Sequence, residues 1–442
     1  MSNTYSIDSI DRCPQQGRLP YHFSSWAHFV SHLDSLGLFR MKPGLERVHA
    51  GIERLGLSRG QGNRIHIVGT NGKGSTAAFL ESIARAHGHS TGLFTSPHFI
   101  TPRERIRITG QLLSEEHWID LANAVYAACP DVDFSYFELL TLMGMLAFER
   151  AGVDVVIMET GLGGTWDATS AFSYDLTLMA PIGLDHEALL GHDLETIAAD
   201  KAGAITGGNV LCGRQEESVL KIIKARADAQ GATFYRGNTG VPLGDDQSFT
   251  IDNDHKLIMS PEHLGLKGLF QQDNALLALQ GWSIFVGARG WPFLPLKCRE
   301  GLARVKHPGR MQLLPGTPTF LLDGAHNKMG LAALETALHA MDFVPDYMIF
   351  SCMGDKNILQ CLEQVQRLCP AGPILIPQIR NNDRAVNAKQ LAALLGQRAQ
   401  SCNDMQAALD LVAGQDSKIL ICGSLYLLGE FFRIKPEELA LG

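Results

Sequence analysis

The sequence lacks the features that would mark a membrane, secreted or nucleic-acid-binding protein. No apolar run reaches the ~18 residues that a membrane span requires. The first 20 residues contain no cationic segment followed by an apolar stretch, so we expect no signal peptide. The net charge of −8 supplies no overall positive field for collecting nucleic acid or an anionic substrate. Any anion-binding site must therefore be local, and we expect neither nucleic acid nor a membrane as partner.

Cysteines are few and irregularly placed. Nine are scattered from Cys13 to Cys422, without a closely spaced pair of the kind that binds a metal. An odd number at irregular spacing is typical of reduced thiols and not of a disulfide framework. We therefore expect a cytoplasmic protein. The sequence carries no coiled-coil or other assembly signal, so we also expect a monomer.

The length and the order of apolar runs predict two α/β domains. A chain of 442 residues exceeds the usual size of one core. Short continuous apolar runs are each followed by a turn and a helical pattern, which indicates parallel strands buried on both faces. The expected strands of the first domain are Ile65–Val68, Thr91–Thr95, Val153–Met158 and Leu176–Ile182, with a helix over Ser75–Ala86.

The alternation of strands and helices stops after the first domain's strands and then resumes. The stretch from Thr206 to Gln272 is rich in glycine and polar turns, and we expect a β-rich insertion or sheet edge there, with a strand at His255–Met259. A helix at Asn274–Gly287 and the proline-bearing segment Trp291–Pro308 follow. We expect a hinge near Lys306–Arg310, an N-terminal ATP-binding domain over residues 1–308, a smaller Rossmann-like domain over 309–442, and a nucleotide in the cleft between them. The second domain is expected to have strands Phe320–Leu322, Tyr347–Cys352, Ile374–Ile376 and Lys418–Cys422, and helices Leu331–Met341, Leu359–Leu368 and Ala388–Gln397.

A glycine-rich loop lies between the first strand and its helix. Three glycines let the backbone bring its N–H groups close to a ligand, and the following helix directs its positive end to the same place. Lys73 adds a mobile charge, and Ser75 or Thr76 a hydroxyl. The lysine precedes the last glycine, which departs from the strict Walker pattern, and an ordinary β–α turn is the alternative. We predict phosphate binding by the loop Gly69, Thr70, Asn71, Gly72, Lys73, Gly74, Ser75 and Thr76.

Two polar residues follow later strands of the predicted sheet. Glu159 ends one strand and His186 follows another, so both should emerge at the edge that carries the phosphate loop. A carboxylate and an imidazole beside a triphosphate would suit Mg²⁺. Either residue alone is more often a satisfied structural group. Lys201 lies in a mostly apolar helical stretch, where local sequence favours a surface lysine with a buried stem.

These motifs resemble the folylpolyglutamate synthase family of the Mur ligase superfamily, and most closely its bacterial bifunctional members, which also act as dihydrofolate synthases. The resemblance covers nearly the whole chain. Its motifs include Val68–Ser75, Thr95–His98, Arg103–Ile106, Tyr136–Glu138, Gly161–Gly164, Asp167–Thr169, Gly183–His186, Asp200–Gly203, Pro308–Arg310 and Asp323–Asn327.

The resemblance implies an ATP-dependent ligase that joins L-glutamate to dihydropteroate or a tetrahydrofolate through an acyl phosphate. It implies two Mg²⁺ sites, the second held by a carbamylated Lys201, which replaces the surface interpretation of that lysine. The loop Gly37–Leu45 is expected to shape the dihydropteroate pocket. The implied residues are Ser96, Glu159, His186 and Lys201 for metal, Asn274, Arg310, Asp323 and His326 for nucleotide, Phe137, Asp167 and Ala168 for the pterin, and Lys73, His186, Lys201, Asp323 and His326 for catalysis.

The chain also departs from the family pattern. The family usually has Arg-Leu-Asp-Ala-Thr-Asn after the double glycine, where this chain has Thr165-Trp166-Asp167-Ala168-Thr169-Ser170. Gln312 replaces a common glutamate, and the late loop Asn381–Arg384 differs as well. These changes concern the acceptor, so polyglutamation alone remains an alternative to both activities. Another amino-acid ligase of the superfamily would lack the Ser96–His98 stretch, and a non-catalytic nucleotide-binding scaffold would lack the metal residues.

Overall fold

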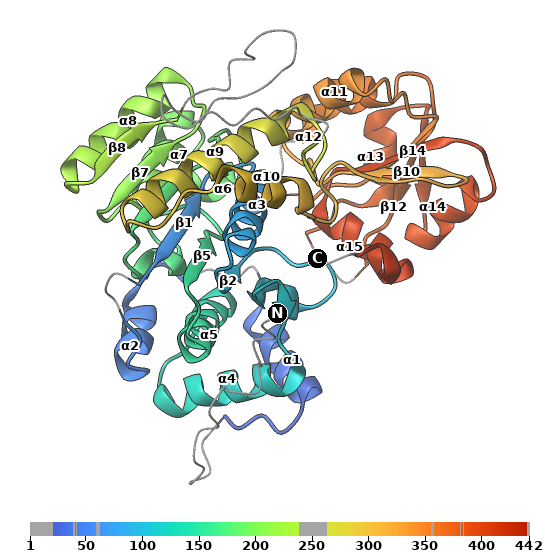
Figure 1. Ribbon diagram of the computed structural model, residues 1–442. Helices are drawn as coiled ribbons and strands as arrows, with labels where there is room; N and C mark the ends of the chain where they lie inside the picture. The colour runs from blue at the N-terminus through green and yellow to red at the C-terminus, as the bar shows by residue number, and fades with distance from the viewer. Residues whose placement is uncertain are drawn as a thin grey trace.

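The computed structural model describes residues 21–38, 40, 42–58, 62–237, 263–354, 358–380, 382 and 384–439. Two α/β units lie side by side (Figure 1). A cavity lined by residues of both units includes the phosphate loop. The strand expected at His255–Met259 lies outside the described residues, as do parts of the loops Gly37–Leu45 and Asn381–Arg384.

An eight-stranded sheet forms the first unit, in the order β4-β3-β2-β5-β1-β6-β7-β8. Neighbouring strands are parallel along the part of this order that runs β2-β5-β1-β6-β7-β8. The pairs β2–β3 and β3–β4 are antiparallel. Every residue of the central strands is buried, because helices cover both faces. The strands are β1 (Arg64–Val68), β2 (Thr91–Phe94), β3 (Ile106–Ile108), β4 (Gln111–Leu112), β5 (Val155–Glu159), β6 (Leu176–Met179), β7 (Asn209–Cys212) and β8 (Thr233–Arg236).

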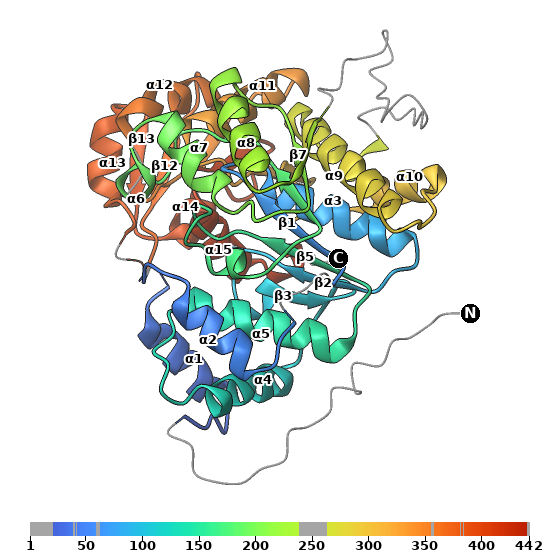
Figure 2. The ribbon, with the colours of Figure 1, turned by 90° about the vertical axis from the view of Figure 1, so that its left-hand side faces the viewer.

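Helices cover the two faces of this sheet (Figures 1 and 2) and form separate apolar cores there. One face packs against α3 (Lys73–Ala86), α9 (Leu269–Gly287) and α10 (Pro295–Arg304). The other is covered by a helical corner of α1, α2, α4 and α5 and, beside it, by α7 and α8. Their bounds are α1 (Trp26–Leu36), α2 (Glu46–Arg54), α4 (Glu115–Ala128), α5 (Tyr136–Ala151), α6 (Glu187–Leu190), α7 (Leu194–Ala202) and α8 (Glu217–Ala229), with short 3-10 turns η2 (Pro102–Arg105) and η3 (Ala168–Ala171).

The second unit contains a six-stranded sheet in the order β13-β12-β11-β14-β10-β9. All neighbours are parallel except β9, which is antiparallel to β10. Helices α11 to α13 pack on one face, and α14 and α15 on the other. The elements are β9 (Gln312–Leu314), β10 (Thr319–Leu322), α11 (Lys328–Ala340), β11 (Tyr347–Phe350), α12 (Ile358–Leu368), β12 (Ile374–Pro377), α13 (Ala388–Leu395), β13 (Ala399–Cys402), α14 (Met405–Val412), β14 (Lys418–Cys422), α15 (Leu425–Ile434) and η5 (Pro436–Glu438).

The predicted strands and helices that fall on described residues are confirmed, with two corrections. The alternation does not stop at Thr206, because β7, α8 and β8 continue the parallel sheet to its edge. The buried residues of α8 include Val219, Ile223 and Ala227, a helical spacing that the charged residues between them obscured. The proline-bearing segment after α9 also contains a helix, α10, which begins at Pro295 because proline suits the first helical turn.

The two units touch through apolar side chains. The Phe99 ring meets Phe432 of α15 edge-on, with ring centroids 5.0 Å apart, and Phe270 of α9 packs against the core of the second unit. The chain crosses between the units at Gly309, whose φ of 63° favours glycine. A Cβ there would lie 2.6 Å from Leu428, so the crossing is tightly packed. Within the described residues, no helix is long and apolar enough to cross a membrane.

Candidate active site

A cavity of about 1120 Å³ lies between the two units. The sequence-predicted residues converge on it from both sides, although they are spread over more than half of the chain. Thr76 is the exception: it is fully buried, and its hydroxyl has no hydrogen-bond partner among the described residues. The predicted residues that line the cavity are Gly69–Ser75, Ser96, Phe137, Glu159, Asp167, Ala168, His186, Lys201, Asn274, Arg310, Asp323 and His326.

The phosphate loop is held open at the end of β1. The backbone N–H groups of Thr70 and Asn71 both donate to the Pro181 carbonyl, which fixes the loop to the segment after β6. Gly72 has φ 84°, and a Cβ on it would lie 2.3 Å from Asn274 Oδ1, so only glycine fits. Helix α3 begins directly after it without a side-chain cap, which leaves its N-terminal N–H groups for a ligand. The loop therefore has the geometry of an anion site.

Lys73 is the partly buried cation of this loop. Its Nζ donates to the Thr70 carbonyl at 3.3 Å. Burial lowers the pKa of Lys73, and the carboxylates of Glu159 and Asp185 oppose that shift. A phosphate would add negative charge at the same place and favour the charged ammonium.

Glu159 supplies a buried carboxylate at the end of β5. Its Oε2 accepts the Ser96 N–H at 2.9 Å, while Oε1 lies 3.6 Å from where a Cβ on Gly74 would stand. Burial raises the pKa of Glu159, and Lys73 offsets part of that shift. The described residues contain no cluster of three or more His, Cys, Asp or Glu that would hold a metal alone. Oxygen ligands from Ser96 and Glu159 beside a phosphate site still suit Mg²⁺, which usually completes its shell with waters and phosphate oxygens.

His186 lies in the segment that follows β6. It has φ 52°, an unusual backbone conformation for a residue other than glycine, and its N–H donates to Asp185 Oδ1 at 2.8 Å. The imidazole is about one-third exposed in the cavity wall. The tight turn therefore presents the ring beside the phosphate loop.

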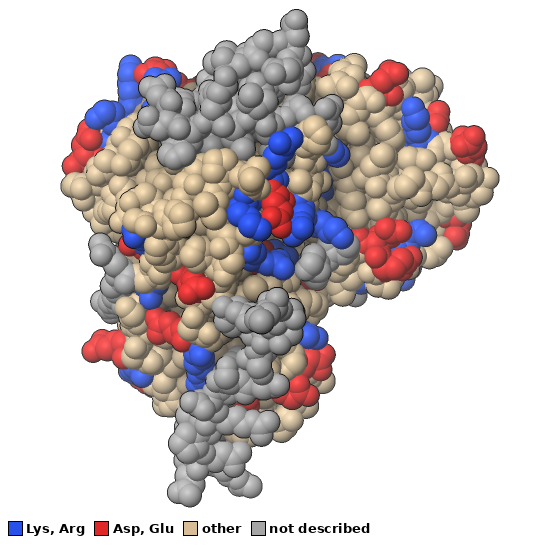
Figure 3. Space-filling model, in the orientation of Figure 1, with Lys and Arg blue, Asp and Glu red and all other residues tan. Residues whose placement is uncertain are grey.

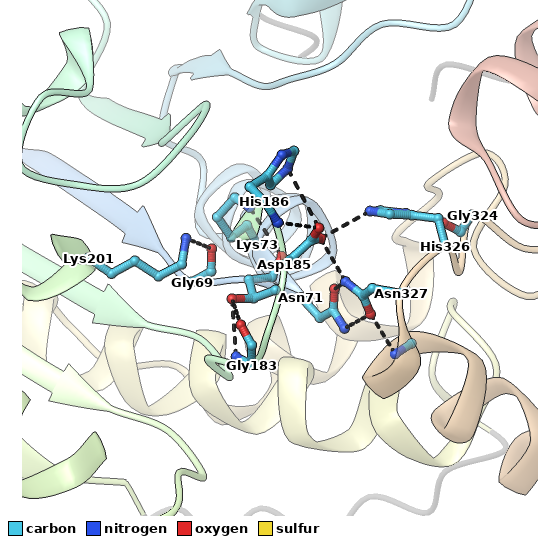
Figure 4. A network of polar contacts seen from close by, with 12 residues as sticks. Gly69, Asn71, Lys73, Gly183, Asp185, His186, Lys201, Gly324, His326 and Asn327 are labelled. Atoms are coloured by element: carbon cyan, nitrogen blue, oxygen red, sulfur yellow. Dashed lines mark hydrogen bonds and ion pairs between the residues drawn. The ribbon is translucent and has the colours of Figure 1, made fainter. Parts of the chain in front are cut away.

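Lys201 is not a surface residue. It is 4% exposed on α7, and its Nζ donates to the Gly69 carbonyl at 3.0 Å (Figure 4). Burial, followed by the charge of Lys73, lowers the pKa of Lys201 to about 7. An amine with this pKa is about half uncharged at pH 7, and the uncharged form is the one that reacts with CO₂ to form a carbamate.

The loop before η3 forms another wall of the cavity. Both oxygens of Asp167 are occupied, one by the N–H groups of Gly161 and Leu162 and the other by Thr169. The carboxylate thus shapes the loop and has no free oxygen aimed at a ligand. Trp166 lines the cavity with 55% of its surface exposed, an unusual exposure for a large apolar ring. The sequence analysis noted Trp166 as part of a departure from the family pattern but did not predict it as a site residue.

Residues of the second unit close the cavity. Asp323 accepts the N–H groups of Met311 and Ala325 at 3.0 and 2.8 Å, which ties the segment after β10 to the crossing near Arg310. Burial raises the pKa of Asp323, and the Arg310 guanidinium opposes the shift. His326 contacts the Gly324 carbonyl through Nδ1 at 2.8 Å and directs Nε2 to Asp185 Oδ2, 3.4 Å away.

Two residues of this arrangement were not among the predicted site residues. Asp185 and Asn327 join the units through a 2.8 Å hydrogen bond from Asn327 Nδ2 to Asp185 Oδ2 (Figure 4). Both occur inside motifs that the sequence analysis quoted. Their pairing over 142 positions could not be read from one sequence, although their location beside His186 and His326 was a signal.

Comparisons with known proteins agree with this geometry. Residues 309–425 match the model of the glutamate ligase domain of Mur ligases. The chain is 31% identical over 418 residues to folylpolyglutamate synthase of Lacticaseibacillus casei, covering 91% of this chain and 97% of that protein.

Solved structures give the same result. The structure of Escherichia coli FolC in complex with DHPP and ADP superposes with a TM-score of 0.84 at 29% identity, covering 95% of this chain and 99% of that one. Bifunctional folylpolyglutamate synthase/dihydrofolate synthase of Yersinia pestis, complexed with AMPPNP and a Mn ion, gives a TM-score of 0.81 at 28% identity, covering 95% and 100%.

Proposed function

The chain belongs to the folylpolyglutamate synthase/dihydrofolate synthase family, and on that premise we propose that it joins L-glutamate to folate-type carboxylic acids using ATP. The observation that carries the proposal is the cavity itself. It combines a phosphate loop that carries a partly buried cation, a metal-compatible carboxylate and an aromatic wall, and the unit that matches the glutamate ligase domain forms its other side.

The reaction needs an activated carboxylate, because a carboxylate resists attack by an amine at neutral pH. The acceptor carboxylate attacks the γ-phosphorus of ATP, the bond to ADP breaks, and an acyl phosphate forms. The glutamate amine then attacks the acyl carbon, and inorganic phosphate leaves as the amide forms. Lys73 and the loop N–H groups would hold the β- and γ-phosphates during the transfer, which depends mainly on positioning and electrostatics.

Ser96, Glu159 and His186 would hold one Mg²⁺, and Lys201 as its carbamate a second. Bound Mg²⁺ would neutralise charge on the transferred phosphoryl group. The buried Lys201 amine with its pKa of about 7 supports carbamylation. Asn274, Arg310, Asp323 and His326 would enclose the nucleotide, and closure of the second unit would keep water from the acyl phosphate.

Dihydropteroate and tetrahydrofolates are the proposed acceptors, received by Phe137, Ala168 and the loop that Asp167 shapes. Trp166 would add an aromatic surface for their rings. The relatives named above include both a folylpolyglutamate synthase and a bifunctional enzyme, so polyglutamation alone is the second candidate. The test is phosphate release from ATP with Mg²⁺ and glutamate, comparing the two acceptors and a control without acceptor.

Turnover with both acceptors would support the bifunctional activity. Turnover with tetrahydrofolate alone would leave a folylpolyglutamate synthase. Absence of turnover with either would refute the folate assignment and direct attention to other amino-acid ligases of the superfamily.

We further propose a domain boundary between residues 308 and 309, a cytoplasmic location and a monomeric state. The boundary is supported by the crossing at Gly309 and by the start of the matched ligase domain. The location is supported by the eight described cysteines, which are all buried free thiols. The net charge of −8 supports the absence of a nucleic-acid partner, although Figure 3 shows a group of basic side chains at the centre of one face.

A further inference from the structure

A reciprocal pair of amides connects the phosphate loop to the second unit. Asn71 Nδ2 donates to Asn327 Oδ1, and Asn327 Nδ2 donates to Asn71 Oδ1, both at 3.0 Å (Figure 4). Asn327 is only 5% exposed, although it lies at the boundary between the units. The two residues are 256 positions apart, so the pair exists only when the units are together.

A second contact extends this pair to the segment after β6. Asn327 Nδ2 also donates to Asp185 Oδ2 at 2.8 Å, and His326 Nε2 lies 3.4 Å from the same oxygen. Asp185 is 7% exposed, and its other oxygen accepts the His186 N–H. One buried carboxylate therefore contacts two consecutive residues of the second unit and the backbone of a residue beside the phosphate site.

A purely structural role explains only part of this arrangement. Asn327 is the N-cap of α11, and its Oδ1 accepts the Gly330 N–H at 2.8 Å. That role requires an acceptor oxygen alone. The amide nitrogen makes both of its contacts across the boundary, where they stabilise no helix. The nitrogen is therefore the part of Asn327 that needs an explanation beyond capping.

We propose that Asn71, Asn327 and Asp185 form a latch that holds the second unit against the phosphate loop while the acyl phosphate exists. These are positioning residues, because they act by keeping the cavity closed. The inference rests on the proposed function and extends it to how water is excluded. Opening would break the amide pair and the bond to Asp185 together, since all three pass through one side chain.

The test is the variant Asn327→Ser, which keeps a capping oxygen and removes the donating nitrogen. The matched control is Asn387→Ser, the same change at the N-cap of α13 in the same unit and outside the cavity lining. We expect Asn327→Ser to lower kcat/KM for glutamate about tenfold or more, because two buried hydrogen bonds are lost. We also expect it to release more phosphate than amide formed, whereas the control keeps the ratio near one.

Two further measurements separate the latch from other effects. The double variant Asn71→Ser/Asn327→Ser should lower kcat/KM for glutamate by clearly less than the product of the two single-variant factors. Either substitution alone already removes the amide pair. Small-angle scattering with bound ADP should give a larger radius of gyration for Asn327→Ser than for the wild type or the control. An unchanged ratio of phosphate to amide and an unchanged radius would overturn the latch.

Small-angle scattering also distinguishes failure of the latch from failure of the proposed function. If the wild-type protein releases no phosphate with any folate acceptor, the ligase proposal fails. In that case a larger radius for Asn327→Ser would still show that the pair holds the two units together, but not that it protects an acyl phosphate, and an unchanged radius would overturn the latch itself.

Discussion

Lys201→Met should make the protein more stable and inactive. Methionine matches lysine in length and carries no charge into a site that is 4% exposed. The pKa of Lys201 is lowered from 10.5 to about 7, and each unit corresponds to 1.36 kcal/mol, so holding the protonated amine there costs roughly 5 kcal/mol. Losing the bond to the Gly69 carbonyl offsets about 1 kcal/mol. The net gain is therefore about 4 kcal/mol under conditions where the wild-type amine is protonated.

The stability that Lys201→Met gains over the wild type should decrease as the pH rises. Because the folded pKa lies below the unfolded one, the unfolded wild-type chain binds more protons between pH 7 and 10.5, and wild-type stability rises with pH over that window. The variant lacks this slope. Its advantage should therefore fall from about 4 kcal/mol near pH 6 to about 1 kcal/mol near pH 9.

Urea denaturation in metal-free buffer without CO₂ measures this difference while Lys201 remains an amine. Lys224→Met, at an exposed lysine on α8, is the control and should change the free energy of unfolding by about 0.5 kcal/mol or less. A Lys201→Met protein that is less stable than wild type near pH 6 would refute the reasoning. Retained phosphate release by the variant would refute the catalytic role.

Other substitutions test separate parts of the site. Lys73→Ala should lower turnover more than about 100-fold, because the phosphates would lose the cation of the loop, and the melting temperature should stay near wild type, because the one hydrogen bond lost goes to a carbonyl of the same loop. His326→Ala should lower kcat about 100-fold with little change in urea midpoint, because its side chain is one-quarter exposed; near-wild-type turnover would exclude it from the chemistry. Glu159→Gln keeps an acceptor for the Ser96 N–H, so a Mg²⁺ titration should show at least about tenfold weaker binding, and an unchanged titration would remove it from the metal site. Trp166→Ala should raise KM for the pterin acceptor about two- to tenfold and leave KM for ATP unchanged; an equal rise in both would argue for a folding defect.

The sequence predicted the fold well where strands are buried on both faces. Runs such as Ile374–Ile376 and Ile419–Cys422 are continuous and apolar because helices cover both sides of each sheet. The edge of the first sheet was harder to predict from the sequence. Strand β8 is mostly exposed, so its sequence carries no continuous apolar run, and α8 before it is interrupted by charged residues.

The site residues were likewise predictable only where local sequence determines their position. Local motifs placed Glu159 and His186 at the cavity, because parallel strands bring their carboxyl ends to one edge. Local sequence misjudged Lys201, since nothing adjacent to it indicates that the Gly69 carbonyl covers its amine. The Asp185–Asn327 contact could not be predicted, because it depends on how the two units meet.

The amide pair between Asn71 and Asn327 has a thermodynamic consequence. It joins the loop that would bind nucleotide to the unit that would bind glutamate, so binding at one place biases the other through a shared closed state. Linkage then requires reciprocity: the factor by which ATP tightens glutamate binding must equal the factor by which glutamate tightens ATP binding. Removing the pair should reduce both factors together, and the enzyme would lose the preference for holding both substrates at once.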